Sequence, residues 1–170
     1  MSVSLRPATS ADVAYLVDLL GSEDVAPFLA AVRAFTAEEV AEEVARSERE
    51  PEAFGVLIFE VDGEAAGTAT WERTNRRSRI ASVGGLAIAP GLRGTGVGVE
   101  AARAIQRHLL GELGFHRIQM EVYGFNERAL RHAERAGWIR EGVRRKAYWR
   151  NDEWVDGVLF GLVTEDLDQA

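Results

Sequence analysis

The most informative stretch of this chain is Ile80-Ala-Ser-Val-Gly-Gly-Leu-Ala-Ile-Ala-Pro-Gly-Leu-Arg-Gly-Thr-Gly-Val-Gly98. Its first ten residues are almost all apolar or small, and they predict a buried strand over 80–89. Further along, apolar residues recur at spacings of three and four, which predicts an amphipathic helix from about Gly94 to just before Gly114. The glycines of residues 93–98 therefore stand between a buried strand and the first turn of a helix.

This glycine-rich loop predicts a binding site for an anion such as a pyrophosphate. Glycines leave backbone N–H groups unshielded, and a helix start adds roughly half a positive charge. Arg93 supplies a charged hydrogen-bond donor beside the loop. Two other phosphate motifs do not fit. A P-loop needs a Gly-Lys pair, and a dinucleotide fingerprint needs the spacing GxGxxG, whereas Gly94, Gly96 and Gly98 read GxGxG.

The remaining patterns predict an α/β protein, with helices packed on a mixed sheet and a strand-helix-strand unit over 80–123. Further strands are expected over residues 3–6, 54–60, 65–73, 118–122, 138–150 and 153–164. Further helices are expected over residues 12–20, 36–49 and 126–135, the second opened by a capping box of Thr36 and Glu39 and the third by Asn126 as N-cap. Asp62-Gly63 predicts a hairpin turn between the strands over 54–60 and 65–73. Gly84 and Gly85 predict a bulge inside their strand. No linker or repeat divides the chain, so we expect one domain over residues 1–170.

Composition and charge exclude several classes of protein. Of the 170 residues, 46% are hydrophobic and 28% charged, a balance typical of globular proteins and not of disordered or membrane chains. The absence of cysteine excludes disulfides, thiolate metal sites and cysteine nucleophiles, and the three histidines lack metal-ligand spacing, so we expect no metal. The start does not read as a secretory signal, which predicts a cytoplasmic location. No apolar stretch approaches about 18 residues, and the net charge is −7, so neither a membrane nor a nucleic acid is expected as partner.

The glycine loop resembles the Q/R-x-x-G-x-G/A pyrophosphate motif of the GNAT superfamily of acyl-CoA N-acyltransferases, with Arg93, Gly96 and Gly98 at its signature positions. The resemblance covers about residues 53–164. Other motifs are similar to the RimJ/RimL-like branch, namely Leu86-Ala-Ile-Ala-Pro90, Gly114-Phe-His-Arg117, Asn126-Glu-Arg-Ala129, Ala136-Gly-Trp138, Glu141-Gly142 and Trp154-Val-Asp156. The resemblance implies the GNAT fold, a mixed, mostly antiparallel sheet of six to seven strands, splayed open after residue 88 and flanked by about four helices.

The resemblance also implies a reaction and a cosubstrate. It implies an enzyme that moves the acetyl group of acetyl-CoA directly, in a ternary complex, to a primary amine such as a peptide N-terminus, an amino sugar, a polyamine or another small amine. The strand residues Leu86, Ala87 and Ile88 would pair with the pantetheine arm. The loop residues that would hold the pyrophosphate are Arg93, Gly94, Thr95, Gly96, Val97 and Gly98. Asn126 and Ala129 would contact the same cofactor.

The catalytic residues are less clearly indicated, because the chain departs from the common pattern. GNAT enzymes often have a tyrosine as general acid at the position that Ala133 occupies here. Tyr123 and Tyr148 are the alternative acids, and Glu72 and Glu121 are the candidate bases, acting through water. A second hypothesis is therefore a CoA-binding protein with little or no catalytic activity.

The acceptor pocket of this superfamily is built largely from the first two helices and the last hairpin. Residues 1–64 carry 14 acidic residues against 4 arginines, which predicts a cationic, partly apolar acceptor. Phe28 and Phe35 are the candidate substrate contacts. The acidic residues nearest to them in sequence are Glu23, Asp24, Glu38, Glu39, Glu42 and Glu43. A third hypothesis is that the last hairpin and the exposed strand edges form a homodimer.

Overall fold

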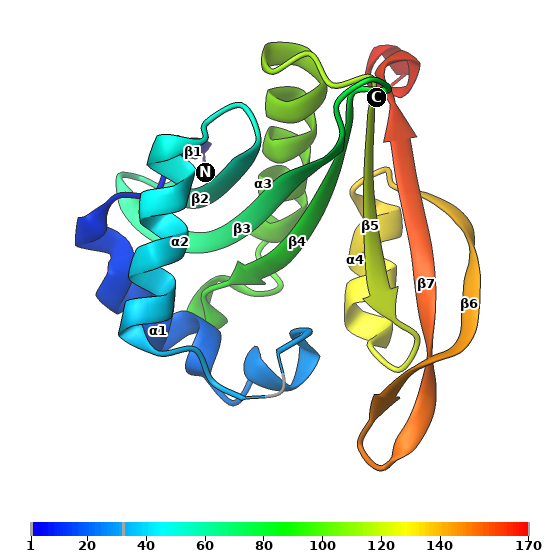
Figure 1. The fold of residues 1–170 in the computed structure, drawn as a ribbon, viewed down its shortest axis with the longest axis horizontal. Helices are drawn as coiled ribbons and strands as arrows, with labels where there is room; N and C mark the ends of the chain where they lie inside the picture. The colour runs from blue at the N-terminus through cyan, green and yellow to red at the C-terminus, as the bar shows by residue number, and fades with distance from the viewer. Residues whose placement is uncertain (1, 32, 170) are drawn as a thin grey trace.

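One seven-stranded sheet runs through the part of the chain that the computed structural model describes, residues 2–31 and 33–169 (Figure 1). The strands lie in the order β1-β2-β3-β4-β5-β7-β6, and neighbours are antiparallel except for β4 and β5. Their bounds are β1 Val3–Pro7, β2 Phe54–Val61, β3 Glu64–Asn75, β4 Ile80–Ile88, β5 Arg117–Tyr123, β6 Ile139–Arg150 and β7 Glu153–Val163. The α-helices are α1 Val13–Gly21, α2 Ala37–Arg49, α3 Val97–Gln106 and α4 Glu127–Arg135. This arrangement confirms the predicted α/β class and the mixed, mostly antiparallel sheet flanked by four α-helices.

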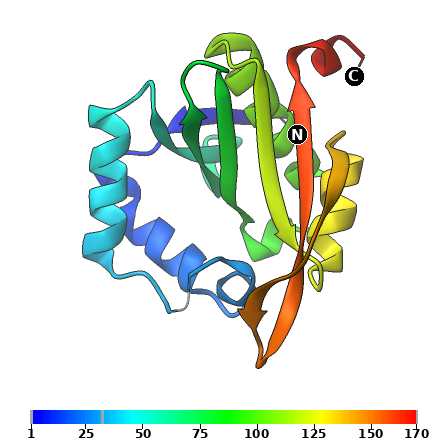
Figure 2. The same ribbon diagram turned by 45° about the vertical axis from the view of Figure 1, so that its right-hand side comes forward.

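Helices cover both faces of the sheet, which explains why β2 is apolar without interruption. Leu57 and Phe59 of β2 pack into the larger core, together with α3 and α4. Val56 and Ile58 point to the opposite face and pack against α1 and α2. A strand that is buried on both faces needs no polar alternation. Figures 1 and 2 show α1 and α2 on one side of the sheet and α3 on the other.

The predicted helices are confirmed, with two differences at their starts. The first helix is preceded by a short 3₁₀ turn, Ser10–Asp12, whose Asp12 carboxylate accepts a hydrogen bond from the Thr9 N–H at 2.8 Å. The helix after the glycine loop begins at Val97 and not at Gly94. Gly94 and Gly96 have φ values of +76° and +92°, which a right-handed helix does not allow. This helix continues to residue 112 as a π-helical segment.

The sheet opens between β4 and β5, and the opening begins earlier than predicted. The two parallel strands pair at only three positions, the last of which is Ser82 with Gln119. The splay therefore starts after residue 82, and the expectation that it starts after residue 88 was wrong. The physical reason is the predicted bulge, where Gly85 has a φ of +58° and β4 gains a residue against β3. Figures 1 and 2 show the two strands adjacent at one end and separated at the other.

Candidate active site

A cavity of about 840 Å³ lies where β4 and β5 separate. One wall is formed by β4 and the glycine loop, the other by β5 and α4, and the segment between α1 and α2 contributes its rim. The sequence-predicted residues that line it are Phe28, Leu86, Ala87, Ile88, Arg93, Gly94, Gly96, Gly98, Glu121, Tyr123, Asn126, Ala129 and Tyr148. The fold thus brings nine of the eleven predicted cofactor residues and three of the four predicted catalytic residues to one space.

The glycine loop presents backbone N–H groups at the start of α3. Within the described residues, the N–H groups of Gly94 through Gly98 donate to no backbone carbonyl. A Cβ atom on Gly94 or Gly96 would meet nothing within 4 Å, but the positive φ values would strain any other residue there. Free N–H groups at a helix start are suited to binding an anion. The loop geometry therefore fits a phosphate-bearing ligand.

Arg93 crosses from the loop to the rim of the cavity. Its Nε donates to the carbonyl oxygen of Ile88 at 3.3 Å, and its Nη1 lies 3.2 Å from the Asp24 carboxylate. Arg128 of α4 donates to the backbone carbonyl of the same Asp24 at 3.4 Å. The segment after α1 is thus held from both walls of the cavity.

Helix α4 begins at the cavity with the residue predicted to cap it. The Asn126 side-chain oxygen accepts a hydrogen bond from the Ala129 N–H at 3.1 Å, which confirms the predicted N-cap. One turn later, His132 packs against the first turn of α3, so close that a Cβ on Gly98 would lie 3.0 Å from its Nε2. That nitrogen is buried and has no hydrogen-bond partner among the described residues. A side chain at residue 98 would therefore crowd His132 where the two helices meet.

Tyr148 and Glu121 form a hydrogen-bonded pair at the β5 side of the cavity. The Tyr148 hydroxyl donates to Glu121 Oε2 at 2.8 Å, and Arg144 Nη1 lies 3.5 Å from the same oxygen. Burial, and then the hydrogen bond to Glu121, raises the pKa of the Tyr148 hydroxyl above its usual value. The Tyr148 hydroxyl is therefore protonated at pH 7.

The backbone of β6 and β7 makes this pair possible. Arg144 pairs with Gly157 and Tyr148 with Val155, so β6 gains two residues over β7 between these positions. Lys146 lies within this irregularity with a φ of +50°, and its N–H donates to the Asp156 carboxylate at 2.7 Å. Gly157 leaves the space in which the Glu121 carboxylate and the Tyr148 ring meet, because a Cβ there would overlap both.

Aromatic side chains surround this pair. The Tyr123 ring stacks on Phe125 with centroids 5.3 Å apart and meets the Tyr148 ring edge-on at 5.5 Å. Phe28 reaches Phe125 from the segment after α1, at 6.1 Å between centroids. The Arg150 guanidinium lies 5.2 Å from the Tyr123 ring centroid. This end of the cavity is consequently rich in aromatic rings, and its polar groups include the Glu121 carboxylate and the hydroxyl groups of Tyr123 and Tyr148.

Other predicted site residues lie outside the lining of the cavity. Glu72 is on β3 and forms an ion pair with Arg46 of α2 at 2.8 Å. Phe35 packs with α1 and α2 and lines a separate cavity of about 480 Å³. Thr95 and Val97 belong to the loop but do not line the cavity; Thr95 donates to Leu92 and Val97 is buried. Ala133 lies on the buried face of α4 and is fully enclosed in the core.

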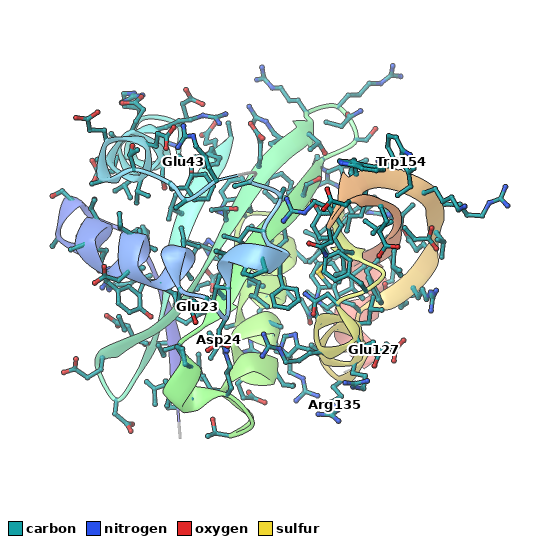
Figure 3. All side chains as sticks on the ribbon, turned by 90° about the horizontal axis from the view of Figure 1, so that it is seen from below. Glu23, Asp24, Glu43, Glu127, Arg135 and Trp154 are labelled. Atoms are coloured by element: carbon teal, nitrogen blue, oxygen red, sulfur yellow. The ribbon has the colours of Figure 1, made fainter. Side chains whose placement is uncertain are left out.

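The acidic excess of the first 64 residues does not gather at the cavity. Of the six acidic residues expected near the acceptor, only Asp24 lines it. Glu39 pairs with Arg33, and Glu42 pairs with Arg49 on the same helix. Figure 3 shows Glu43 on α2, well separated from Asp24. The charge count predicted an acidic pocket, but helix α2 turns its acidic residues away from this space.

Sequence reasoning missed the cationic residues that α4 contributes. Arg128, Arg131, His132 and Arg135 all line the cavity. Their spacing of three, four and seven residues is that of one helical face, and this signal was present in the sequence. Within residues 2–31 and 33–169, no group of three histidine, aspartate or glutamate side chains is placed to bind a metal ion. No helix in the same part of the chain is long and apolar enough to cross a membrane.

Comparison with known proteins agrees with the fold described above. A family model described as an acetyltransferase (GNAT) domain matches residues 2–139. The chain is 30% identical over 83 residues to the SPbeta prophage-derived uncharacterized N-acetyltransferase YokL of Bacillus subtilis, covering 49% of this chain and 47% of that protein. The chain thus spans about half the length of the curated relatives it matches.

Two solved structures show how widely the fold is shared. One is a spermidine N-acetyltransferase from Vibrio cholerae in complex with CoA and spermine, with a TM-score of 0.86, 18% identity and 97% of each chain covered. The other is the aminoglycoside acetyltransferase AAC(6')-Ib in complex with coenzyme A, with a TM-score of 0.82, 22% identity and 99% of each chain covered. At these identities the similarity establishes the fold.

Proposed function

This chain belongs to the GNAT acetyltransferase family, and from that premise we propose that it transfers the acetyl group of acetyl-CoA to a primary amine. The amine attacks directly in a ternary complex, because the chain has no cysteine to carry the acetyl group. We further propose that it belongs to the RimJ/RimL-like branch of this family, which the motifs from Asn126 to Trp138 support. It also includes a single catalytic domain over residues 1–170, a cytoplasmic location and no nucleic acid or membrane as partner.

The donor half of the site is proposed to lie between β4 and the start of α3. The free N–H groups of the glycine loop fit the pyrophosphate, with Arg93 beside them. Beyond Ser82, β4 has no partner strand on its β5 side. The backbone of Leu86, Ala87 and Ile88 therefore has the free edge that an amide-bearing pantetheine arm requires. Asn126 and Ala129 face this edge from α4 across the same cavity.

The acceptor half is proposed to be the aromatic end of the cavity around Glu121 and Tyr148. An unperturbed alkyl ammonium, with a pKa of about 10.4, is neutral in fewer than about one molecule in a thousand at pH 7, so a proton must be removed before attack. The Glu121 carboxylate is the acidic side chain at this end, and it can bind the ammonium group and accept its proton. Tyr123 and Phe28 supply apolar contacts for the rest of the acceptor.

Tyr148 is proposed to return a proton to the departing sulfur. Acetyl-CoA supplies a thioester, whose thiol leaving group has a pKa near 8.5 and needs only modest help at neutral pH. The raised pKa of Tyr148 keeps its hydroxyl protonated, and the hydrogen bond to Glu121 fixes its position. Tyr148 thereby takes the place of the tyrosine for which Ala133 stands in this chain. Glu72 is left out of the proposal because it lies on β3 outside the lining of the cavity, where it pairs with Arg46 of α2.

The acceptor is proposed to be an amine with an apolar or aromatic neighbourhood. The two solved structures named above come from proteins described as acting on spermidine and on aminoglycosides, which are both amines and support this class.

A homodimer is proposed through β6, the edge strand of the sheet, where Ile139 and Val143 are 50% and 39% exposed.

The observation that carries the proposal is the row of free N–H groups at the entrance of α3. We expect acetyl-CoA to raise the melting temperature, and Gly96→Glu to abolish the rise, because it strains the loop and places a carboxylate in the anion site. Gly91→Glu is the matched control, since Gly91 has open space around it and no positive φ. An unchanged rise in the Gly96 variant would overturn the assignment of the loop.

Release of free thiol from acetyl-CoA over a panel of amines tests the reaction itself. Turnover with an alkyl amine, a peptide N-terminus or an amino sugar supports an acetyltransferase. Binding of acetyl-CoA without turnover on any of them supports the second hypothesis, a CoA-binding protein with little or no catalytic activity. The buried Ala133 is the observation that favours this second hypothesis.

A further inference from the structure

The α4 wall of the cavity carries positive charge that the glycine loop does not account for. Arg128, Arg131 and Arg135 all line the cavity from one helical face. Among the described lining residues the acidic ones are Asp24 and Glu121, and both already have arginine partners on other elements, Arg93 and Arg144. The arginines of α4 therefore face a space in which a bound anion would be the natural counter-charge.

The three arginines differ in how far they are already engaged. Arg128 donates to the Asp24 carbonyl and lies over the Phe28 ring at 5.7 Å. Arg131 pairs with Glu127 one turn earlier at 3.1 Å, but both side chains are largely exposed, and such a surface pair contributes little and is readily exchanged. Arg135 has no ion-pair partner within 4.0 Å among the described residues. Arg131 and Arg135 are consequently available to a ligand.

These two arginines lie next to the expected pyrophosphate site. His132 touches the first turn of α3, since a Cβ on Gly98 would lie 3.0 Å from its Nε2. Arg131 directly precedes His132, and Arg135 follows it by one turn. In Figure 3, Arg135 and Asp24 both lie toward the lower edge of the view, and Asp24 is the rim residue that pairs with Arg93. A ligand group that leaves the loop toward α4 would therefore meet both guanidinium groups.

We propose that Arg131 and Arg135 bind the 3′-phosphate of coenzyme A and make the protein distinguish CoA from 3′-dephospho-CoA. The inference rests on the proposed function, because it assumes that the loop holds the pyrophosphate. In CoA a single ribose separates the 3′-phosphate from the pyrophosphate, which matches the adjacency of α4 and the loop. The planar guanidinium fork fits phosphate oxygens in a bidentate manner.

Isothermal titration of the full chain with CoA and with 3′-dephospho-CoA tests this assignment without requiring an acceptor. We expect the wild type to bind CoA at least about tenfold more tightly, as charge-assisted hydrogen bonds to a phosphate imply. In the Arg131→Ala, Arg135→Ala double variant the CoA affinity should fall and the affinity for 3′-dephospho-CoA should stay the same, so that the ratio approaches one. Alanine favours helix, so the double variant should fold.

Two further variants distinguish specific binding of the 3′-phosphate by Arg131 and Arg135 from a general effect of losing positive charge. Arg107→Ala removes an exposed arginine that does not line the cavity and should leave the ratio unchanged. The Arg131→Lys, Arg135→Lys variant keeps the charge but not the fork and should restore only part of the ratio.

The outcomes distinguish the inference from the function on which it rests. Equal affinity of the wild type for the two ligands, or an unchanged ratio in the double alanine variant, would overturn the 3′-phosphate assignment and leave the acetyltransferase proposal standing. Absence of binding of both ligands to the wild type would overturn the proposed function, and the inference with it.

Discussion

At the scale of single residues, the proposed reaction depends on a hydroxyl and a carboxylate that the fold places 2.8 Å apart. Tyr148 comes from β6 and Glu121 from β5, and β7 lies between these strands. Their contact requires that β7 have no side chain at residue 157. A role in proton transfer and a role in holding the strands together make different predictions for substitutions at these two positions.

The first prediction concerns proton transfer by this pair. Tyr148→Phe should lower kcat about 10- to 100-fold, and Glu121→Gln should lower kcat/KM for the amine about 100-fold, because each removes a proton-handling group. The KM for acetyl-CoA should stay unchanged in both. Steady-state kinetics with the best amine from the panel measures these values. Tyr15→Phe is the matched control, since the Tyr15 hydroxyl is buried without a hydrogen-bond partner among the described residues. Equal kcat values for wild type and Tyr148→Phe would contradict the role of Tyr148.

The glycine loop could be predicted at this scale, but the Glu121–Tyr148 pair could not. Glycines, an arginine and a helix start are local features, so residues 93–98 indicate their chemistry without knowledge of the fold. The Tyr148 hydroxyl instead reaches Glu121 because of strand register and a local irregularity of two residues in β6. Register is fixed by contacts between segments far apart in the sequence. For the same reason Glu72 looked equivalent to Glu121 until the sheet placed it beside Arg46.

At the scale of elements, two neighbouring glycines determine the course of β4. Gly85 has a φ of +58° at the bulge, whereas the adjacent Gly84 has no positive φ and would make only ordinary contact with Thr70 if it gained a side chain. The two positions therefore provide a comparison within one strand.

The second prediction uses that comparison. Gly85→Ala should lower the free energy of unfolding by about 1 kcal/mol, the typical cost of a left-handed conformation for an L-residue, and should weaken acetyl-CoA binding by disturbing the bend. Gly84→Ala should change the stability by less than about 0.5 kcal/mol. Urea denaturation and a titration with acetyl-CoA measure both effects. Equal stability of the two variants would show that the bulge does not depend on the glycine conformation.

The third prediction concerns the junction of β1, β2 and the start of α1. Arg6 pairs with Asp12 and with Glu60, and the hydrogen bonds from Arg6 lower the pKa of Asp12 from 3.8 to about 2. The unfolded chain therefore binds this proton at a higher pH than the folded chain. The stabilisation is complete above about pH 4 and is lost as the pH falls toward 2.

Asp12→Asn should accordingly lower the free energy of unfolding at pH 7 by roughly 2 kcal/mol. The difference from wild type should shrink as the pH falls from 4 to 2. Denaturation by urea at pH 7, 4 and 2.5 measures the trend. A difference that stays constant over this range would mean that the Asp12 carboxylate is not the group responsible.

The elements themselves were mostly predictable, because periodicity and capping are local. Thr36 and Glu39 form the predicted capping box of α2, and the Asp62-Gly63 turn joins β2 to β3 as expected. The start of α3 was misplaced by three residues, since left-handed glycines look like helix-permitting small residues in a sequence. Residues 107–112 form a π-helical segment inside the stretch that was predicted as one continuous helix.

At the scale of the whole molecule, the two parts of the open sheet are linked across the cavity by the segment after α1. Arg150 of β6 donates to the carbonyl oxygens of Ala31 and Pro27 at 3.2 and 3.0 Å. Arg93 and Arg128 hold Asp24 of the same segment from the loop and from α4. The segment thus links the glycine loop that follows β4 to α4 and β6 on the other side of the opening, where β4 and β5 pair at only three positions.

The fourth prediction follows from this bridge. Arg150→Ala should increase hydrogen exchange in residues 22–31 and raise the KM for the amine about three- to tenfold, because the rim that carries Phe28 loses two charge-assisted hydrogen bonds. The KM for acetyl-CoA should not change. Arg145→Ala, on the same strand but outside the lining of the cavity, is the control. Equal effects of the two variants on the amine KM would show that loss of charge, and not of the bridge, is responsible.

The parting of β4 and β5 leaves two main chains facing each other, with Leu86 on one and Val122 on the other. Every residue except proline carries the same backbone N–H and C=O groups. Most point mutations in these strands therefore leave the number and direction of these hydrogen-bonding groups unchanged. The proposed acceptor end, in contrast, is shaped by the individual side chains of Phe28, Tyr123 and Tyr148. On the proposed function, mutations of these side chains can therefore change which amine is accepted, while the backbone contacts to acetyl-CoA are retained. Because the two ends of the cavity depend on different parts of the chain, the acceptor specificity of such a fold can change without loss of cosubstrate binding.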